Sequence, residues 1–349
     1  MTENKRSGVP KGTGEDMHPA RLSLLLAGVF AIVGLPANAA TLRSDTAVVS
    51  ARSAAAFFAA RHAASSKNGL LIASAEAPVR SRSAWPDATN TGVPPGTILT
   101  DYKDECVITE NNFVVNGKTV NCSLSIQASN VIIKNSKING QVILDTDRPG
   151  SKLWSFSMFD SEVDAGTIQQ SAVGWGNLQV LRSNIHGGVT SVQCDETSSS
   201  CLVQDSYLHG QYMPEGQDWH LGGFLSDGGR NITLRHNYII CDHPVNSVGG
   251  GCTGDVNLIP NFDAIKGALI ENNFFGANTY LSYCTYGGEK KNSKFPHSYN
   301  VIYKNNILMR GANKKCGAYG PVTNFNATNT GNLWLDNFWD DGTVVHPAN

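Results

Sequence analysis

The amino-acid sequence predicts an all-β protein, a right-handed parallel β-helix that forms a single domain over residues 85–349. Three observations lead to this fold: a recurring strand–corner–strand segment, apolar columns at fixed positions around each corner, and a uniform composition from residue 85 onward. Short strands repeated in this way are typical of solenoids, in which each coil packs on its neighbours. The leucine spacing of a leucine-rich repeat is absent, and an antiparallel sandwich would not keep one register over eight units.

Each repeat has an apolar residue two positions before a polar corner residue and another three positions after it. Inward-facing side chains of stacked coils should align, so Ile133, Val180, Leu234 and Ile270 are expected in one buried column. The residue after the corner is Ser in four segments and then Asn in four, which predicts a hydrogen-bonded ladder along the axis. The segments are residues 130–138, 156–163, 177–185, 201–208, 231–239, 268–275, 300–308 and 332–339.

The spacing of the corners changes along the chain. Corners are 22–25 residues apart in the early repeats and 31–36 apart in the last four intervals. We therefore expect insertions on the late coils, and in solenoids such insertions often gather on the binding face. The first insertion holds the stretch QDWHLGGFLSDGG, residues 217–229, which has no strand or helix period and is expected to form one wall of a groove.

The N-terminal part is expected to direct export. Residues 22–35 are one apolar run that follows basic residues and precedes an A-x-A cleavage pattern, so residues 1–39 are predicted to be a signal peptide. Residues 40–84 are rich in Ala, Ser and Arg and are predicted to be a low-complexity pro-segment or flexible arm. The expected location is therefore extracellular or periplasmic, with no membrane association after cleavage. A membrane anchor is the alternative for the apolar run.

The eight cysteines predict four disulfides, because export leads to an oxidising compartment. Sequence alone does not fix the pairing. The natural local pairs are Cys194–Cys201 and Cys241–Cys252. Cys284 and Cys316 fall at similar distances past their corners on adjacent coils, which leaves Cys106 and Cys122.

Three features resemble secreted bacterial right-handed β-helix proteins of the pectate-lyase-like superfamily. They are the coil pattern N-[VI]-x-[IL]-x-[NH]-N, the H-x-x-G…SDGG stretch, and the CTYGG and CGAYGP segments at 284–288 and 316–321. The resemblance covers about residues 85–349 and implies a carbohydrate-active protein, since the superfamily includes polysaccharide lyases, hydrolases, epimerases and phage tailspikes. Many relatives have H-x-D-G where this chain has Gly222 in place of the acid.

Charge is distributed unevenly along the late coils. Acids dominate residues 195–263, whereas bases and tyrosines dominate residues 279–315. On stacked coils the two blocks adjoin, so oxygen ligands for Ca²⁺ would lie beside bases and rings that suit an anionic sugar polymer. The predicted catalytic residues are His220, Asp227 and Lys290. The predicted substrate-binding residues are Trp219, Tyr283, Tyr286, Lys291, Arg310 and Lys314, and the predicted metal ligands are Asp242 and Asp255.

This combination suits β-elimination on a glycan that contains uronic acid, in which a base removes the C5 proton while a cation neutralises the carboxylate. The expected partner is an anionic polysaccharide bound by a monomer, with Ca²⁺ as the expected ion and no organic cofactor. The net charge of −2 does not suggest a nucleic-acid partner, and no nucleotide or zinc-protease motif occurs. Two alternatives stay open: a glycoside hydrolase or epimerase on the same scaffold, and a non-catalytic glycan-binding or surface protein.

Overall fold

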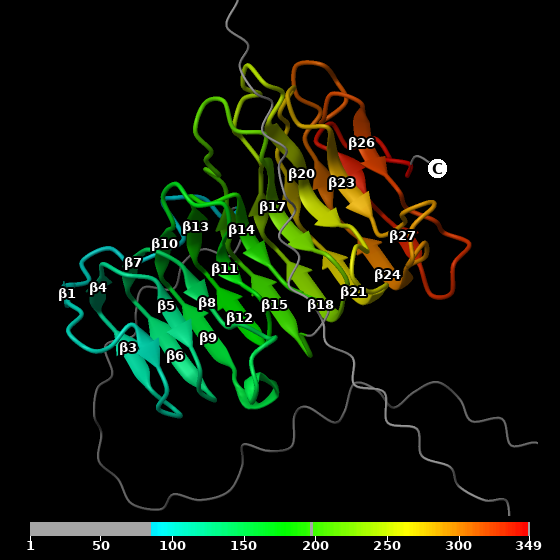
Figure 1. The fold of residues 1–349 in the computed structure, drawn as a ribbon. Helices are drawn as coiled ribbons and strands as arrows, with labels where there is room; N and C mark the ends of the chain where they lie inside the picture. Colours follow the sequence, from blue (N-terminus) through cyan, green and yellow to red (C-terminus); the bar gives the residue numbers. More distant parts are fainter. Residues whose placement is uncertain (1–84, 196–197, 348–349) are drawn as a thin grey trace, which may run out of the picture. The chain divides into compact units, whose positions relative to one another are not determined.

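Each coil of the chain contributes one strand to each of three parallel sheets, here called sheets A, B and C (Figure 1). The computed structural model describes residues 85–195 and 198–347. Within these residues sheets B and C have nine strands each, which makes nine coils, numbered 1 to 9 along the chain, with β2, β3 and β4 in coil 1. Sheet A has ten strands because β1 precedes coil 1. This architecture confirms the predicted all-β right-handed parallel β-helix.

The strands of all three sheets are short. Sheet A consists of β1 (Thr100–Asp101), β4 (Lys118–Val120), β7 (Lys137–Asn139), β10 (Glu162–Asp164), β13 (Asn184–His186), β16 (Tyr207–Leu208), β19 (Tyr238–Ile239), β22 (Phe274–Phe275), β25 (Ile307–Leu308) and β28 (Phe338–Trp339). Sheet B consists of β2 (Val107–Ile108), β5 (Leu124–Ile126), β8 (Val142–Ile143), β11 (Ser171–Gly174), β14 (Thr190–Gln193), β17 (His220–Ser226), β20 (Gly251–Leu258), β23 (Tyr283–Gly287) and β26 (Gly320–Thr323). Sheet C consists of β3 (Val114–Asn116), β6 (Val131–Lys134), β9 (Phe156–Phe159), β12 (Leu178–Leu181), β15 (Cys201–Gln204), β18 (Gly229–Arg235), β21 (Ile265–Glu271), β24 (Tyr299–Lys304) and β27 (Leu333–Leu335).

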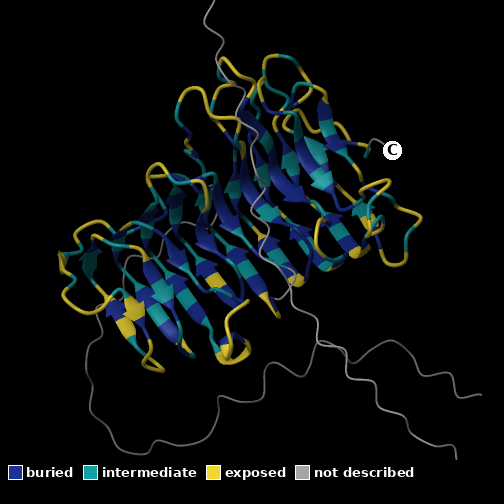
Figure 2. Ribbon diagram, viewed as in Figure 1, coloured by how far each residue is buried: buried dark blue, intermediate teal, exposed yellow. Residues whose placement is uncertain are grey.

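The core runs through the interior of the coils as stacked apolar columns (Figure 2). Along sheet C, Val180 pairs with Val203, which pairs with Leu234, which in turn pairs with Ile270. These side chains are completely buried, as is Ile133 further down the same column. The predicted inward column is thus confirmed, and the alternation of buried and more exposed residues along each strand follows the strand period of two.

The corner between sheets C and A is the most regular part of the fold. On coils 2 to 9 its first residue has a positive φ of 47–56°, a conformation that Asn and Asp tolerate better than most residues. The second residue is the buried Ser or Asn of the predicted ladder. For example, Asn273 Nδ2 donates to Asn306 Oδ1 of the next coil at 3.1 Å, and the Asn237 backbone N donates to Asn273 Oδ1 at 3.0 Å. The ladder therefore satisfies backbone and side-chain groups together.

An N-terminal strap, residues 85–99, lies across the outside of these corners. The Trp85 ring stacks on His236 at 5.2 Å and contacts Phe274 at 5.4 Å between ring centroids. Further along, the Gly92 N–H donates to the Arg182 carbonyl at 3.0 Å, and β1 then pairs with β4 in the first coil. The strap thus spans from coils 6 and 7 back to coil 1.

Long connections flank sheet B on the later coils. On the edge entered from sheet A they are residues 209–219, 240–250, 276–282 and 309–319, and on the edge that leads to sheet C they are residues 259–264, 288–298 and 324–332. On the earlier coils the longer connections to sheet C are residues 144–155, which hold the 3-10 helix η1 (Ser151–Leu153), and residues 194–200. The insertions expected on one face therefore line both edges of sheet B.

The stretch at residues 217–229 is not a loop, contrary to the sequence prediction. Its central seven residues form β17, whereas residues 217–219 belong to the connection before this strand and residues 227–228 form the turn before β18. Its glycines are required by close packing: a Cβ at Gly222 would lie 2.3 Å from Asn257 Nδ2, and a Cβ at Gly223 would lie 2.4 Å from a methyl carbon of Ile239. The strand period was hidden because these glycines occupy strand positions that elsewhere carry larger residues.

All four disulfides have the expected pairing: Cys106–Cys122, Cys194–Cys201, Cys241–Cys252 and Cys284–Cys316. Four disulfides in one chain indicate an oxidising environment. The predicted signal peptide and pro-segment, residues 1–39 and 40–84, lie outside the described residues. Within the described residues, no helix has the length and apolar character needed to cross a membrane.

Candidate functional site

The structure separates two of the predicted catalytic residues. His220 begins β17 and is exposed at the edge between sheets A and B, whereas Asp227 follows the other end of the same strand and is nearly buried. At about 3.3 Å of rise per residue, the two positions are roughly 20 Å apart. They cannot act on the same reacting bond, so the predicted catalytic set does not form one centre.

The other predicted catalytic residue, Lys290, lies on the same side as Asp227. Asn261 bridges them, because its Nδ2 donates to Asp227 Oδ1 while its Oδ1 accepts from Lys290 Nζ. These residues follow β17, β20 and β23 on three successive coils. The network fastens the connections at the edge between sheets B and C, with Lys290 and the neighbouring Lys291 exposed there.

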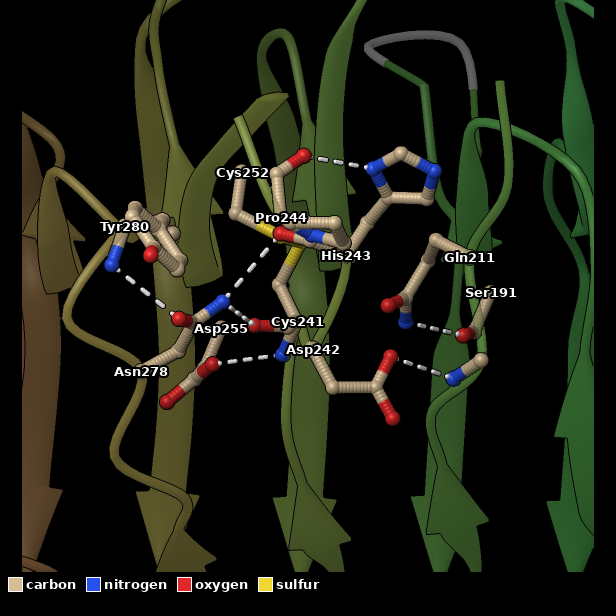
Figure 3. The surroundings of a disulfide bond; sticks show 12 residues. Ser191, Gln211, Cys241, Asp242, His243, Pro244, Cys252, Asp255, Asn278 and Tyr280 are labelled. Carbon is tan, nitrogen blue, oxygen red and sulfur yellow. Dashed lines mark hydrogen bonds between the residues drawn. A yellow bond between two sulfur atoms is a disulfide. The ribbon is translucent and has the colours of Figure 1, made fainter. Parts of the chain in front are cut away.

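Asp242, a predicted metal ligand, lies at the edge between sheets A and B (Figure 3). Its Oδ1 accepts from the Gly210 N–H at 3.0 Å, and burial raises the pKa of its carboxyl even though the residue keeps solvent contact. The adjacent Gln211 is buried; its Nε2 donates to Ser191 Oγ at 2.7 Å, while its Oε1 is without a partner. An unpaired buried amide oxygen beside a carboxylate supplies oxygen ligands of the type that Ca²⁺ prefers.

The carboxyl group of Asp255, the second predicted metal ligand, points into the interior and not toward Asp242. It is completely buried in β20, and its Oδ1 accepts from the Cys241 N–H at 2.8 Å. Burial is the main cause that raises its pKa well above the usual range, with a further contribution from Asp242. Figure 3 shows its second oxygen directed away from Asp242. The two acids are electrostatic neighbours, but they do not form one ligand set.

The tyrosines at the A–B edge present their rings on successive coils. Tyr283 packs edge-on against Tyr286 at 5.7 Å and lies 5.8 Å from Tyr319 between ring centroids. Both Tyr319 and Tyr280 are exposed, at 72% and 56%, on the connections that precede β26 and β23. Aromatic faces of this kind can pack against sugar rings.

The remaining predicted binding residues differ in how available they are. Trp219 is half-buried against the core. Arg310 is bound to the C-terminal turn, because its guanidinium donates to Asp341 and lies 4.5 Å from the centre of the Trp339 ring. By contrast, Lys314 is exposed on the connection that leads to β26.

Sequence reasoning missed a half-buried histidine on the outer face of sheet A. His186 ends β13, and its Nε2 lies 3.2 Å from Glu162 Oε1 on the preceding coil, while its Nδ1 lies 3.7 Å from Asp164 Oδ1. The hydrogen bond to His186 is the largest cause that lowers the pKa of Glu162 to about 2, and Lys137 also donates to this carboxylate at 3.0 Å. Glu162 is therefore ionised at neutral pH and accepts a hydrogen bond from His186 in the tautomer that carries its proton on Nε2; in that tautomer Nδ1 is the unprotonated ring nitrogen.

His209, on the next coil, connects His186 to Asp242. Its ring stacks on Tyr207 at 3.9 Å and lies 5.4 Å from the His186 ring. Burial lowers the pKa of His209 to about 4, so it is neutral, and its Nε2 donates to Asn184 Oδ1 at 2.8 Å. The residue after His209 is Gly210, whose backbone N–H donates the hydrogen bond to Asp242 Oδ1. We call the row of Glu162, His186, His209, Gln211 and Asp242 the A–B edge site.

The sequence does contain a signal for this site. His186 and His209 each follow the buried apolar residue of a sheet A strand, in the segments NIH and YLH on consecutive coils. Equivalent positions of adjacent coils lie about 4.8 Å apart, so two histidines in this column must be neighbours. Comparison of the chain with known protein families, with curated proteins and with solved structures finds no match.

Proposed function

We propose that this protein is exported, binds an anionic polysaccharide along the edge between sheets A and B, and cleaves it by β-elimination. The observation that carries the proposal is the A–B edge site itself, in which a histidine oriented by an ionised glutamate lies in one row with the Asp242 carboxyl group and the unpaired oxygen of Gln211. The exposed rings of Tyr280 and Tyr319 and the cation of Lys314 follow on the later coils of the same edge. They provide stacking and charge attraction for an extended anionic chain.

In this proposal His186 Nδ1 takes the C5 proton of a uronate residue. Glu162 holds the opposite nitrogen, and Asp164, 3.7 Å from Nδ1, stabilises the imidazolium that forms. Asp242 and Gln211 Oε1 would hold a Ca²⁺ ion, which would neutralise the uronate carboxylate and so make the C5 proton more acidic. His209 lies between His186 and the proposed Ca²⁺ ligands, and because it is neutral it places no additional positive charge next to the base.

Incubation with a panel of uronate polymers tests the proposal. A lyase produces both unsaturated ends, read by their absorbance, and reducing sugar. On a substrate that responds, His186→Ala should lower turnover by roughly 10²-fold or more, the scale of general base catalysis. His346→Ala is the matched control, since His346 is an exposed histidine outside the site and should keep full turnover. Full activity in His186→Ala would exclude this residue as the base.

Hydrolysis is the second candidate, and one observation favours it. The pKa of Glu162 is lowered and that of Asp242 is raised, so the site contains an ionised and a more readily protonated carboxyl group. Glycoside hydrolases use such a pair as base or nucleophile and as general acid. Reducing sugar without unsaturated ends would select this reaction, and binding without either product would select a glycan-binding protein.

A further inference from the structure

A second group of ligand atoms lies in the interior of coils 7 to 9. One carboxylate oxygen of Asp255 and the Sγ atoms of Cys284 and Cys316 all lie within 4.8 Å of one another, and all three residues are buried. Among the described residues, this is the one group of three or more His, Cys, Asp or Glu side chains with this proximity. None of these three residues belongs to the A–B edge site or takes part in the proposed function.

The aspartate is an unusual component of this group. Asp255 is completely buried, its Oδ1 accepts from the Cys241 N–H, and its Oδ2 has no partner. Leaving a buried carboxyl oxygen unpaired costs free energy, so its position needs a reason beyond packing. An oxygen beside two sulfur atoms is suited to complete a metal-ligand set.

A fourth donor is already in place. The Gly276 carbonyl oxygen lies 3.5 Å from Cys316 Sγ and 3.7 Å from Cys284 Sγ. With Zn–S near 2.3 Å and Zn–O near 2.1 Å, tetrahedral coordination sets a sulfur and an oxygen ligand about 3.6 Å apart. In the disulfide form the carbonyl already lies at about this distance from both sulfur atoms.

Strand register and two backbone hydrogen bonds position these donors. Cys316 lies in the connection before β26, where its N–H donates to the Arg310 carbonyl at 3.0 Å and its carbonyl accepts from the Asn278 N–H at 3.1 Å. Strands β20, β23 and β26 pair in register through Val256, Thr285 and Val322, which places the segments around Asp255, Cys284 and Cys316 on adjacent coils. In the thiol form the backbone should therefore keep this arrangement, while the two sulfur atoms, no longer bonded to each other, move apart to the separation of two zinc ligands, about 3.8 Å. Thiolates favour Zn²⁺ over Ca²⁺, because Ca²⁺ prefers oxygen ligands.

We propose that, when the Cys284–Cys316 disulfide is reduced, Cys284, Cys316, Asp255 and the Gly276 carbonyl bind one Zn²⁺ ion. An added phosphine reductant supplies the two electrons that break the S–S bond and is oxidised to the phosphine oxide with the oxygen of one water molecule, whose two protons go to the sulfur atoms to form two thiols. Zn²⁺ then replaces the thiol protons, which pass to solvent, and forms two Zn–S bonds and two Zn–O bonds. Disulfide and metal exclude each other, so the site belongs to the protein before oxidation.

Cobalt titration of the full-length protein, reduced with a phosphine, tests the site, because thiolate-to-cobalt absorption reports Co²⁺ in a zinc position. We expect one equivalent of Co²⁺ to bind and to be displaced by Zn²⁺ but not by Ca²⁺. Cys284→Ser with Cys316→Ser should abolish this signal. Asp255→Asn should weaken Zn²⁺ binding at least tenfold. The control pair Cys106→Ser with Cys122→Ser should keep the thiolate-to-cobalt absorption.

Absence of the absorption in the reduced wild-type protein, or equal affinity in Asp255→Asn, would overturn the proposal. If reduction unfolds the chain, as read by near-ultraviolet circular dichroism, refolding from urea under the same reductant replaces the titration. One equivalent of Zn²⁺ should then raise the refolded yield of the wild type but not of Asp255→Asn. An equal yield with and without Zn²⁺ would refute the site. Failure of this test leaves the polymer assay unaffected, since the His186 variants are measured on oxidised protein.

Discussion

The corner between sheets C and A and the edge between sheets A and B both join strands of sheet A to a neighbouring sheet, yet they differ in how regular their connections are. The C–A corner has the same two-residue geometry on coils 2 to 9, with a positive φ followed by a buried Ser or Asn. The A–B edge ranges from the short turn at residues 140–141 to the long connection at 240–250. The regular corner fixes the register of the coils, and the irregular edge is consequently free to carry ionisable groups and exposed rings.

This difference predicts where substitutions will be tolerated. At the C–A corner each Asn makes hydrogen bonds to the coils on both sides, so its loss affects several coils. At the A–B edge the connections carry exposed side chains such as Thr279, Tyr280 and Tyr319, whose removal leaves the stacked coils intact. Stability should therefore depend strongly on the corner and weakly on the edge, whereas ligand binding should show the reverse dependence.

The largest effect is expected in the core column behind the corner. Leu234→Asp would place a charge without a partner among completely buried apolar residues, and should destabilise the protein by more than about 4 kcal/mol. Urea unfolding monitored by circular dichroism measures the loss. Lys266→Ala on the exposed side of the neighbouring strand is the control and should change the free energy of unfolding by less than about 0.5 kcal/mol. A mild effect of Leu234→Asp would mean that this column is not continuous in solution.

The next largest effect should come from the ladder. Asn273→Ala leaves partners on adjacent coils unpaired, including the Asn237 N–H, at a cost of about 2–3 kcal/mol. Thermal and urea unfolding of the variant give this cost. Thr279→Ala, which removes a polar side chain from the exposed A–B connection, provides the comparison and should be nearly neutral. Equal losses at the two positions would remove the contrast between corner and edge.

The third effect depends on pH. The pKa of Glu162 is lowered to about 2 from 4.5, so its contribution to stability is present above pH 4.5 and is lost as the pH falls toward 2. We expect about 1–2 kcal/mol once solvent screening of this half-buried group is included. The free energy of unfolding, measured between pH 2 and 5, should fall in the wild type more than in Glu162→Gln. Identical profiles would show that Glu162 does not form its ion pairs in solution.

The smallest effect on stability should come from the exposed rings. Tyr280→Ala combined with Tyr319→Ala should change the free energy of unfolding by less than about 0.5 kcal/mol. On a glycan that binds, the same double variant should lose about tenfold in affinity, because each ring stacks on a sugar. Calorimetric titration measures the affinity. Unchanged affinity would place the glycan elsewhere on the molecule.

The fold was predictable from the sequence because its signal is repetitive. One apolar column, one corner and one ladder recur eight times, so a weak pattern in any single segment is strengthened by the others. Disulfide pairing followed from the same register, since Cys284 and Cys316 lie at similar offsets on consecutive coils.

The candidate site was less predictable because it depends on contacts between coils that carry no repeated pattern. The glycines of residues 217–229 suggested an open loop, but Gly222 and Gly223 are required by the packing of Asn257 and Ile239. His186 and Glu162 are 24 residues apart and become neighbours only when the sheet A register is known. The unpaired Gln211 oxygen has no sequence signal, because satisfaction of a buried amide is a property of the three-dimensional structure.

The strap determines how the domain would respond to mechanical load. Tension applied at the N-terminal side of Trp85 does not reach the end of the solenoid first, because Trp85 is anchored beside coils 6 and 7 and the strap returns to coil 1. A pull in that direction would peel the strap from the corners one contact at a time, first the ring contacts of Trp85 and later the Gly92 hydrogen bond. The strap would thus extend at low force, and the stacked coils would bear load only after it is released.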